Sequence, residues 1–478
     1  MQHALLILLF TASYLLFAGG PTWTLVPLLG IAALAVAVAP SRTLAFPRTT
    51  RAFDLSLIAV LAAVGIQAVP MPPILLSVLS PHATALAAAT RLTPVGSVAP
   101  AWRPLSINPW LTLVSLSTAA LGVLTFWVAR GVFNAGGHTR AVLKAITVVG
   151  TVAAAMAIVQ KAVAPRLILF VLAPDMRSAS PFGAFVNRNH FAGWLLLVVA
   201  PVIGYAIARH ETHARRGRWR ESIGQVMSSG MIFTYVAAAV MVSILLLTLS
   251  RSGMASLSAA ALVGWRMSAS RQRGTRVMPM LLGLAGVAAV SAVLFVDPDR
   301  WSERLEQSFG PSAGFSRITI WRESLPLAKD FWLVGTGAGT YSDAMTVYQQ
   351  TRLWVGSMQN WAHFNNAHSH FVQVVCEGGL LLAIPVLACI VTLFVLGMRA
   401  ARADKGEMFW VRVGAAAGLA ALLVQSIWEV ALIMPANAVM TGILAALLLY
   451  ERTGSTATDT AAARHHHAPA PRPLRMAR

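Results

Sequence analysis

Long apolar runs, separated by short polar segments, dominate this chain. Each run is close to the roughly 20 residues that a helix needs to cross the hydrocarbon core of a bilayer. Unbroken apolar runs of this length favour helices over the alternating pattern of barrel strands. We therefore predict an all-α fold, a polytopic membrane bundle of about 12 transmembrane helices. The runs lie near residues 4–19, 22–39, 53–70, 109–128, 141–163, 190–208, 229–249, 253–267, 277–297, 371–398, 410–431 and 433–451.

Composition agrees with a membrane protein. Of the 478 residues, 57% are hydrophobic and only 11% are charged, against roughly 25% charged in a soluble domain. The formal net charge is +20, but the basic residues gather in short loops between apolar runs. That distribution follows the positive-inside rule, so we do not expect nucleic acid as a partner. Cys376 and Cys389 are too far apart along one helix to form a disulfide.

The basic loops also orient the bundle. They follow the second, fourth, sixth, eighth and tenth runs, and the C-terminal tail is basic as well. The rule predicts that these loops and both termini lie in the cytoplasm. The segments around 164–189, 250–252 and 298–370 then face outward. The stretch 72–90 contains several prolines, and we predict that it is interfacial or re-entrant.

The segment 298–370 is the only sizeable extramembrane loop that the pattern predicts. It holds five tryptophans, which either stack on sugars or sit in the membrane interface. Residues 297–309 read as a capped amphipathic helix. We predict a second helix that begins at Arg317 and ends near Lys329. Trp321 lies one turn after Arg317 in this helix. The glycine cluster Gly335–Thr340 lacks the ending of a phosphate-binding loop, so we interpret it as a turn.

Several cationic and polar groups fall on this outer side. Arg251 lies between two apolar runs, next to serines and a glycine whose backbone N–H groups could form an anion nest. An arginine in that position either snorkels to the interface or meets an anion. Arg317 is a second candidate cation. Two guanidinium groups suit the charge of a diphosphate.

His368 lies just before the tenth run, beside asparagines and a second histidine. A histidine at the membrane boundary can take a proton from a sugar hydroxyl near neutral pH. The spacing of His363, His368 and His370 fits no standard zinc site, so we predict no metal and no other cofactor.

Two further groups complete the candidate site. Asn187, Arg188 and His190 open the sixth run, where polar side chains cap a helix or bind a ligand. Glu429 lies near the outer end of the eleventh run. An intramembrane acid is a functional candidate, and a structural salt bridge to one of the arginines is the alternative.

These residues give the chain a resemblance to a known family. Five parts of the sequence resemble segments of the O-antigen ligase/polymerase family of bacterial membrane glycosyltransferases. They are Phe182–Gly193, Leu247–Gly253, Arg317 with Trp321, Gly335–Thr340 and Ala367–Leu381. The family pattern of histidine, a polar residue, nine residues and glycine falls on His368, Ser369 and Gly379. Leu382 stands where the family has glycine, threonine or tyrosine. The resemblance covers roughly residues 180–440.

The resemblance implies a GT-C-like helical fold in the bacterial inner membrane, with a periplasmic active site and metal-independent glycan transfer from undecaprenyl diphosphate. Arg251 and Arg317 would hold the diphosphate, and His368 would be the base. Arg188, His190 and Asn187 match a motif of this subgroup and, with Trp321 and Glu429, are expected to bind substrate. The acceptor would be lipid A–core, a growing polysaccharide or a protein side chain.

Three regions follow from these expectations. Residues 1–180 form N-terminal transmembrane helices, 181–451 form the ligase/polymerase-like region with the periplasmic loop 298–370, and 452–478 form a disordered cytoplasmic tail. Two other functions stay open. One is a transporter of polysaccharide or lipid-linked sugar, which the number of spans permits. The other is a receptor that binds lipid-linked sugar without chemistry.

Overall fold

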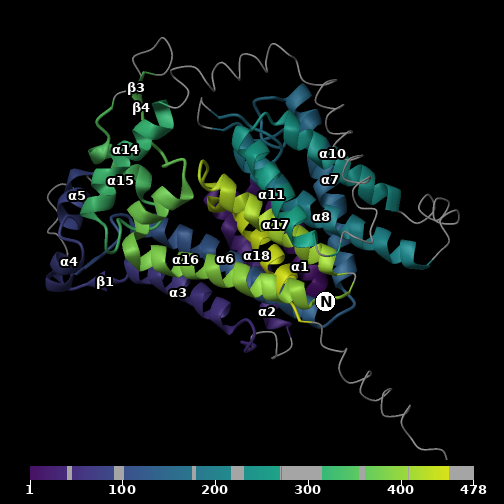
Figure 1. Cartoon of the computed structure of the whole chain (residues 1–478). Helices are drawn as coiled ribbons and strands as arrows, with labels where there is room; N and C mark the ends of the chain where they lie inside the picture. Colours follow the sequence, from purple (N-terminus) through teal and green to yellow (C-terminus); the bar gives the residue numbers. More distant parts are fainter. Residues whose placement is uncertain are drawn as a thin grey trace, which may run out of the picture.

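A computed structural model describes residues 1–39, 46–90, 102–174, 179–216, 231–269, 271, 315–351, 353–354, 361–406 and 408–451 of the chain. These residues are mostly helical (Figure 1). The N-terminal elements are α1 (Gln2–Leu15), η1 (Phe17–Gly19), η2 (Thr22–Thr24), α2 (Leu25–Ala37), α3 (Arg51–Ala68), β1 (Pro70–Met71), α4 (Pro73–Leu79), α5 (Ala83–Ala89), β2 (Arg103–Pro104), α6 (Pro109–Asn134) and α7 (Thr139–Val163). The others are α8 (Arg188–Arg216), α10 (Met231–Leu247), α11 (Arg251–Ser268), α14 (Phe315–Asp330), α15 (Tyr341–Tyr348), β3 (Leu353–Trp354), β4 (Trp361–Ala362), α16 (His370–Ala403), α17 (Phe409–Gln425), η5 (Ala431–Ile433) and α18 (Pro435–Leu449).

Eleven of the twelve predicted apolar runs coincide with helices, and the run 277–297 lies outside the described residues. Five described helices are long and apolar enough to cross a membrane: α3, α6, α7, the first 25 residues of α8, and α16. The apolar helices α1, α2, α10, α17 and α18 are shorter. The chain is therefore a helical membrane protein, and the count of twelve spans stays a prediction.

The helices differ sharply in how much of their surface other helices cover. In the most apolar window of α8, 89% of the residues are buried, whereas in that of α16 only 11% are. α8 runs through the main hydrophobic core, where Trp194 and its neighbours are fully buried. An apolar helix that its own protein leaves uncovered is suited to contact lipid, so α16 lies at the periphery of the bundle.

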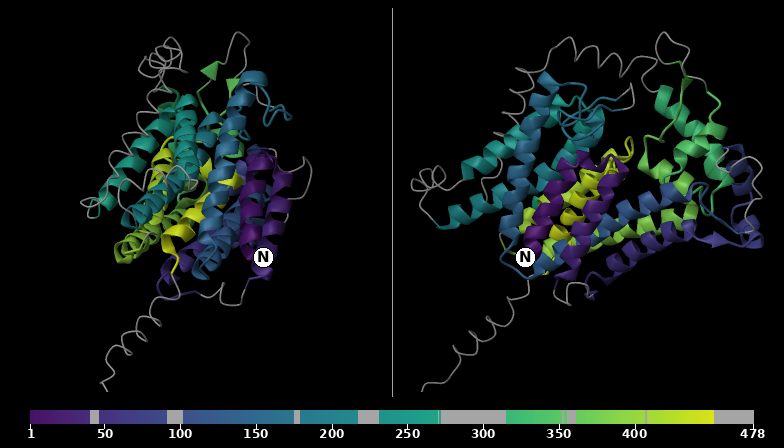
Figure 2. Two further views of the ribbon diagram at one scale, coloured as in Figure 1. Left: turned by 90° about the vertical axis from the view of Figure 1, so that its right-hand side faces the viewer. Right: turned by 180° about the vertical axis from the view of Figure 1, so that it is seen from behind.

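The described part of the outer segment is folded, and it contains the helix that was predicted to begin near Arg317. α14, α15 and the antiparallel pair β3–β4 form within it. Together with α4 and α5, the helices α14 and α15 make a second core that includes Leu76, Leu327, Phe331 and Tyr341. Figure 1 shows this group at one end of α3 and α16, away from α17 and α18, and the view from behind in Figure 2 agrees.

The proline-rich stretch 72–90 contributes the two short helices to this group. α4 and α5 are separated at Ser80–His82, around Pro81, which confirms that prolines interrupt the stretch. Its interfacial position stays a prediction. The predicted amphipathic helix at 297–309 lies outside the described residues.

Polar side chains join this group to the bundle. Glu377 of α16 accepts hydrogen bonds from the backbone N–H groups of Gly339 (2.9 Å) and Tyr341 (3.0 Å). Gln67 of α3 donates to the carbonyl oxygens of Val334 (2.7 Å) and Glu377 (2.8 Å) and accepts from the N–H of Ala338 (3.0 Å). The glycine cluster therefore forms a turn, as predicted, and its glycines 335, 337 and 339 all have positive φ.

Gly379 interrupts α16 at the point where this helix contacts the group formed by α14 and α15. Its φ of 54° and ψ of −154° are not helical. Beyond it, the N–H groups of Leu380 and Leu381 donate to the carbonyls of Trp332 (2.8 Å) and Leu333 (2.9 Å) instead of to their own helix. Leu382, the departure from the family pattern, is buried against Ala63, Val64 and Ala338.

We expect Gly379→Ala to destabilise the protein strongly. A Cβ at Gly379 would lie 2.5 Å from the backbone carbon of Leu333 and 2.6 Å from the nitrogen of Val334, and the backbone conformation alone costs about 1–3 kcal/mol for a non-glycine residue. We predict a loss of at least about 2 kcal/mol in the free energy of unfolding, measured by titration with SDS in mixed micelles.

Gly65→Ala is the matched control. Gly65 lies inside α3, and a Cβ there would meet nothing within 4 Å. An alanine in a helix interior is more favourable than glycine by about 0.5–1 kcal/mol. Equal stabilities of the two variants would contradict the structural role of Gly379.

Candidate functional site

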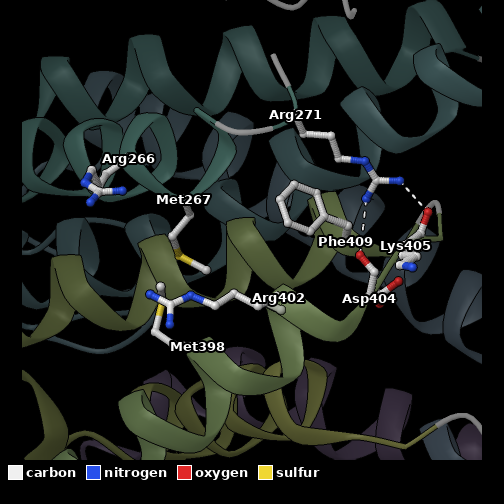
Figure 3. A pocket seen from close by; sticks show the side chains of 9 residues that line it. Arg266, Met267, Arg271, Met398, Arg402, Asp404, Lys405 and Phe409 are labelled. Carbon is white, nitrogen blue, oxygen red and sulfur yellow. Dashed lines mark hydrogen bonds between the residues drawn. The ribbon is translucent and has the colours of Figure 1, made fainter. Parts of the chain in front are cut away.

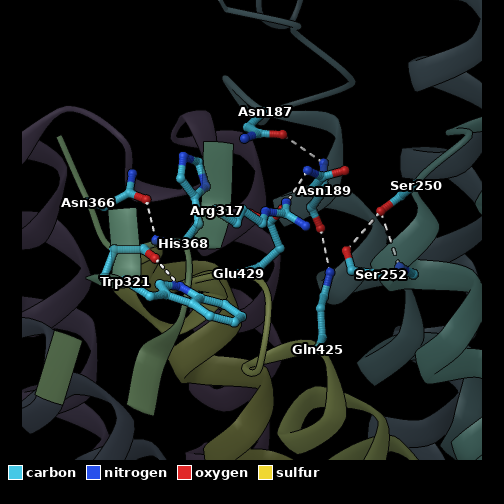
Figure 4. A network of polar contacts seen from close by, with 12 residues as sticks. Asn187, Asn189, Ser250, Ser252, Arg317, Trp321, Asn366, His368, Gln425 and Glu429 are labelled. Atoms are coloured by element: carbon cyan, nitrogen blue, oxygen red, sulfur yellow. Dashed lines mark hydrogen bonds and ion pairs between the residues drawn. The ribbon is translucent and has the colours of Figure 1, made fainter. Parts of the chain in front are cut away.

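Five segments that are distant in the sequence meet at one end of the bundle. They are the starts of α8, α11, α14 and α16 and the segment between α17 and η5. Figure 4 shows side chains from all of them close together. Arg317 lies in the first turn of α14, His368 lies two residues before α16, and Glu429 follows the C-terminal end of α17. The structure thus brings together residues that the sequence separates by up to 240 positions.

Arg317 and Glu429 form the central ion pair. The distance from Arg317 Nη2 to Glu429 Oε1 is 2.7 Å, and the side chains are 31% and 1% exposed. Asn189 Nδ2 donates to the same carboxylate oxygen, also at 2.7 Å. The structure therefore contains the salt bridge that was considered for Glu429, and a part of Glu429 in binding substrate stays a prediction. Burial raises the pKa of Glu429 to about 7, against the opposing effect of the Arg317 charge.

A second polar layer supports this pair. Gln425 Nε2 donates to the backbone carbonyl of Asn189 (2.8 Å), and the Asn187 side chain accepts from the N–H of Asn189 (2.9 Å). Asn189 and Gln425 were not among the predicted site residues. Gln425 is fully buried in an apolar helix, and a buried amide in such a run is the one signal that could have identified it.

His368 is half-buried and has a strained backbone conformation. Its φ is +47°, which is uncommon for a residue other than glycine. Its backbone N–H donates a hydrogen bond to Asn366 Oδ1 at 3.0 Å. Its Nδ1 is buried and has no hydrogen-bond partner among the described residues. Burial, and then the Arg317 charge, lower the pKa of His368 to about 4. The imidazole is therefore neutral at pH 7.

Trp321 fixes the segment that carries His368. Its indole N–H donates to the carbonyl of Ala367 at 2.9 Å, and Figure 4 shows the indole below the His368 segment. This contact couples α14 to the start of α16. The predicted part of Trp321 in binding substrate stays a prediction.

Arg251 is the first residue of α11, and the local structure around it is a helix cap. Ser250 Oγ accepts from the N–H of Gly253 at 3.2 Å and lies 3.2 Å from Ser252 Oγ. One N–H of the predicted anion nest is thus already satisfied by the cap. A Cβ at Gly253 would lie 3.1 Å from Ala192 of α8, so the start of α11 packs closely against the start of α8.

Arg188 and His190 lie in the first turn of α8. The charge of Arg188 acts on Glu429, which adds a second cation to the surroundings of that carboxylate. His190 is buried and interacts electrostatically with His368 and His370. Both residues therefore adjoin the group formed by Arg317, Glu429 and His368.

The three histidines do not converge on one point. His363 Nε2 lies 3.1 Å from Ser342 Oγ in α15, whereas His370 Nε2 accepts from the N–H of Leu432 at 3.1 Å. Within the described ranges, no group of three histidine, cysteine or acidic side chains could hold a metal ion. The absence of a metal requirement stays a prediction about the reaction.

The site can hold an anion and remove a proton. Arg188 and Arg317 face one acid, Glu429, and a neutral imidazole lies beside them. Guanidinium groups bind phosphate oxygens in a fixed geometry. A buried imidazole nitrogen without a partner can accept a proton from a hydroxyl group.

Comparison with protein families gives a match to part of the chain. Residues 236–387 match the family model described as O-Antigen ligase. No curated protein matches the chain. The matched range contains Arg251, Arg317, His368 and Gly379, whereas the start of α8 and Glu429 lie outside it.

Proposed function

We propose, from the match of residues 236–387 to the O-antigen ligase family, that the chain transfers a glycan from undecaprenyl diphosphate to an acceptor hydroxyl. The reaction would take place at the periplasmic face of the bacterial inner membrane, with both termini in the cytoplasm. The product would belong to O-antigen or another surface polysaccharide.

One observation supports this proposal most strongly: Arg317 is held by the buried Glu429 beside the neutral His368. Glu429 Oε1 engages one terminal nitrogen of Arg317. The other N–H donors of a guanidinium group, which has five in all, can then bind a phosphate. A cation that is already fixed in place when the substrate binds does not have to move during the reaction, and it therefore stabilises the charge that develops on the leaving group more effectively.

The proposed step is a direct displacement at the anomeric carbon. The acceptor oxygen forms a bond to this carbon, and the bond from the carbon to the phosphate oxygen breaks with its electron pair passing to the diphosphate. His368 takes the proton of the acceptor hydroxyl. Arg251 and Arg317 stabilise the charge on undecaprenyl diphosphate, and no divalent metal is needed. A single displacement inverts the anomeric configuration.

Donor binding should also raise the pKa of His368. In the free protein its pKa is low partly because Arg317 is close. A bound diphosphate brings negative charge near both groups, and a nearby anion raises the pKa of an imidazole. His368 would then become a stronger base when the donor is in place.

The pH dependence separates the two titrating groups. Glu429, with its pKa raised to about 7, loses its charge as the pH falls below 7 and then holds Arg317 less firmly. His368, with its pKa lowered to about 4, stays neutral over the same range. We predict that kcat/KM of the wild type falls several-fold between about pH 8 and 5.5 as Glu429 takes up a proton.

Glu429→Gln is the variant that checks this assignment. Glutamine mimics the protonated acid, so the variant should show the low-pH activity of the wild type at every pH in this range. A variant whose activity still falls below about pH 7 would assign the titration to another group. Steady-state rates at saturating acceptor, measured across the pH range, give the answer.

The acceptor and the alternative function are tested together. We would incubate purified protein with undecaprenyl-diphosphate glycan and a lipid A–core, polysaccharide or protein acceptor, with and without EDTA, and measure release of undecaprenyl diphosphate. Release that depends on acceptor and persists in EDTA supports metal-independent transfer and identifies the acceptor. Donor binding without release under all conditions would favour a transporter or receptor.

A further inference from the structure

A basic pocket lies at the opposite ends of three helices that form the candidate site. α11 and α16 begin at the site and α17 ends beside it, whereas the pocket lies at the C-terminal ends of α11 and α16 and the start of α17. The 18 residues of α11 span about 27 Å at the rise of a helix. The pocket is therefore close to a bilayer thickness away from His368 and is not part of the proposed active site.

The pocket is large enough for a small polar group. Its volume is about 400 Å³, within the range of about 300–1,000 Å³ that is typical of ligand pockets. Figure 3 shows Arg266 and Arg402 on the same side of it, next to Met267 and Met398. Its lining thus combines positive charge with apolar surface.

Positive charge dominates the lining. Arg266, Arg271, Arg402 and Lys405 contribute four cations, and Asp404 is the one acid among the described lining residues. That acid is already engaged, because Asp404 Oδ2 accepts from Arg412 Nε at 2.9 Å and Oδ1 accepts from the N–H of Gly406 at 2.8 Å. The pocket therefore favours an anionic ligand.

Arg271 and Phe409 give the pocket a fixed wall. The guanidinium carbon of Arg271 lies 4.7 Å from the centre of the Phe409 ring. The same guanidinium donates to the carbonyl oxygens of Asp404 (3.4 Å) and Lys405, and its Nε lies 3.9 Å from Glu211 Oε1, so Arg271 is partly neutralised. Arg266, Arg402 and Lys405 are exposed and can approach a ligand from the other sides.

An apolar track leads from the pocket along α16. Ile384, Leu387, Val391 and Val395 are exposed and follow one another at intervals of three or four residues, so they lie on one face of the helix. The same interval continues to Met398 and Arg402 in the pocket. Only 11% of this helix's most apolar window is buried in the protein, and an acyl chain is the partner that such a track fits.

We propose that this pocket binds the phosphate of an anionic phospholipid whose acyl chain lies along α16. Basic pockets between membrane helices recognise anionic headgroups in this way. A free phosphate would use the cations but not the track, and a zwitterionic lipid would use the track but gain little from four cations. The anionic phospholipid uses both features. This inference does not depend on the proposed glycan transfer.

Lipid binding to the full-length protein tests the proposal. Native mass spectrometry would count phosphatidylglycerol and phosphatidylcholine bound to the wild type, to the double variant Arg266→Gln/Arg402→Gln, and to Arg399→Gln. Arg399 is an exposed arginine of the same helix that does not line the pocket, so it is a matched control. Because the substituted arginines are exposed, we expect all variants to fold, and circular dichroism checks this.

We expect phosphatidylglycerol to bind the wild type at least several-fold more tightly than phosphatidylcholine. The double variant should bind phosphatidylglycerol about tenfold more weakly, from the loss of two cations at the membrane surface, with no change in Arg399→Gln. Equal binding of both lipids to the wild type, or unchanged binding by the double variant, would overturn the proposal. Displacement of the lipid by millimolar inorganic phosphate would overturn it too, because it would identify a site for free phosphate.

Discussion

His368→Ala should slow glycan transfer by about 10²–10⁴ while leaving donor binding intact. The imidazole is neutral, half-buried and next to Arg317, and its Nδ1 has no hydrogen-bond partner among the described residues, so it can accept the proton of the acceptor hydroxyl. A positioned general base contributes about 10²–10⁴ to the rate, and we predict a loss of kcat within that range. Single-turnover release of undecaprenyl diphosphate measures the rate, and titration with donor measures the affinity.

His363→Ala is the control for this experiment. His363 belongs to the same segment but is exposed and pairs with Ser342, so the variant should keep the wild-type rate. A His368→Ala protein that retains more than about a tenth of the wild-type rate would contradict a role as general base. Weaker donor binding with an unchanged rate would assign His368 to binding instead.

Arg317→Ala should lower both activity and stability, for different reasons. Activity falls because the leaving diphosphate loses one fixed cation, and removal of a single such donor costs about 10²–10³ in rate. Stability falls because the carboxylate of Glu429, whose side chain is 1% exposed, loses its cation. Breaking a fully buried pair costs about 3–5 kcal/mol, and we expect about 2–3 because Arg317 is 31% exposed.

The double variant Arg317→Ala/Glu429→Gln separates the two effects. Replacing the carboxylate by a neutral amide removes the uncompensated charge, so the free energy of unfolding should recover most of its loss. Activity should not recover, because the cation is still absent. Recovery of both would mean that Arg317 acts only through folding. Arg322→Ala, an exposed arginine of the same helix, should change neither quantity.

The apolar runs were sufficient to predict the helices because a membrane helix must satisfy its backbone internally and expose apolar side chains to lipid. The helix that begins near Arg317 was also predicted correctly: it covers Phe315–Asp330. The outer segment was predicted less well. Its short helix α15 and the packing of α14 and α15 on α4 and α5 were not predicted, because such tertiary contacts are not visible in a local pattern.

The structure brings the predicted residues Arg317, His368 and Glu429 close together, but their pairings could not be predicted from the sequence. The sequence indicated these three residues because a charged or polar group at a membrane boundary is costly and is usually functional or paired. That Glu429 pairs with Arg317, 112 positions away, depends on how α14 and α17 approach one another. The same holds for Gln67, which reaches Glu377 and Val334 across the bundle. A buried amide signals a partner but does not identify it.

The basic pocket could not be predicted from the sequence either. Arg266, Arg271, Arg402 and Lys405 indicated only the orientation of loops in the sequence. Their convergence on one pocket depends on how the ends of α11 and α16 meet the start of α17.

Transport and transfer are separated most directly in proteoliposomes that hold lipid-linked glycan and an acceptor on known sides. We would measure the undecaprenyl diphosphate released and the glycan joined to the acceptor in the same sample. Our account predicts one undecaprenyl diphosphate for each glycan transferred, with the anomeric configuration inverted. Movement of intact lipid-linked glycan across the bilayer, with no undecaprenyl diphosphate released, would contradict it.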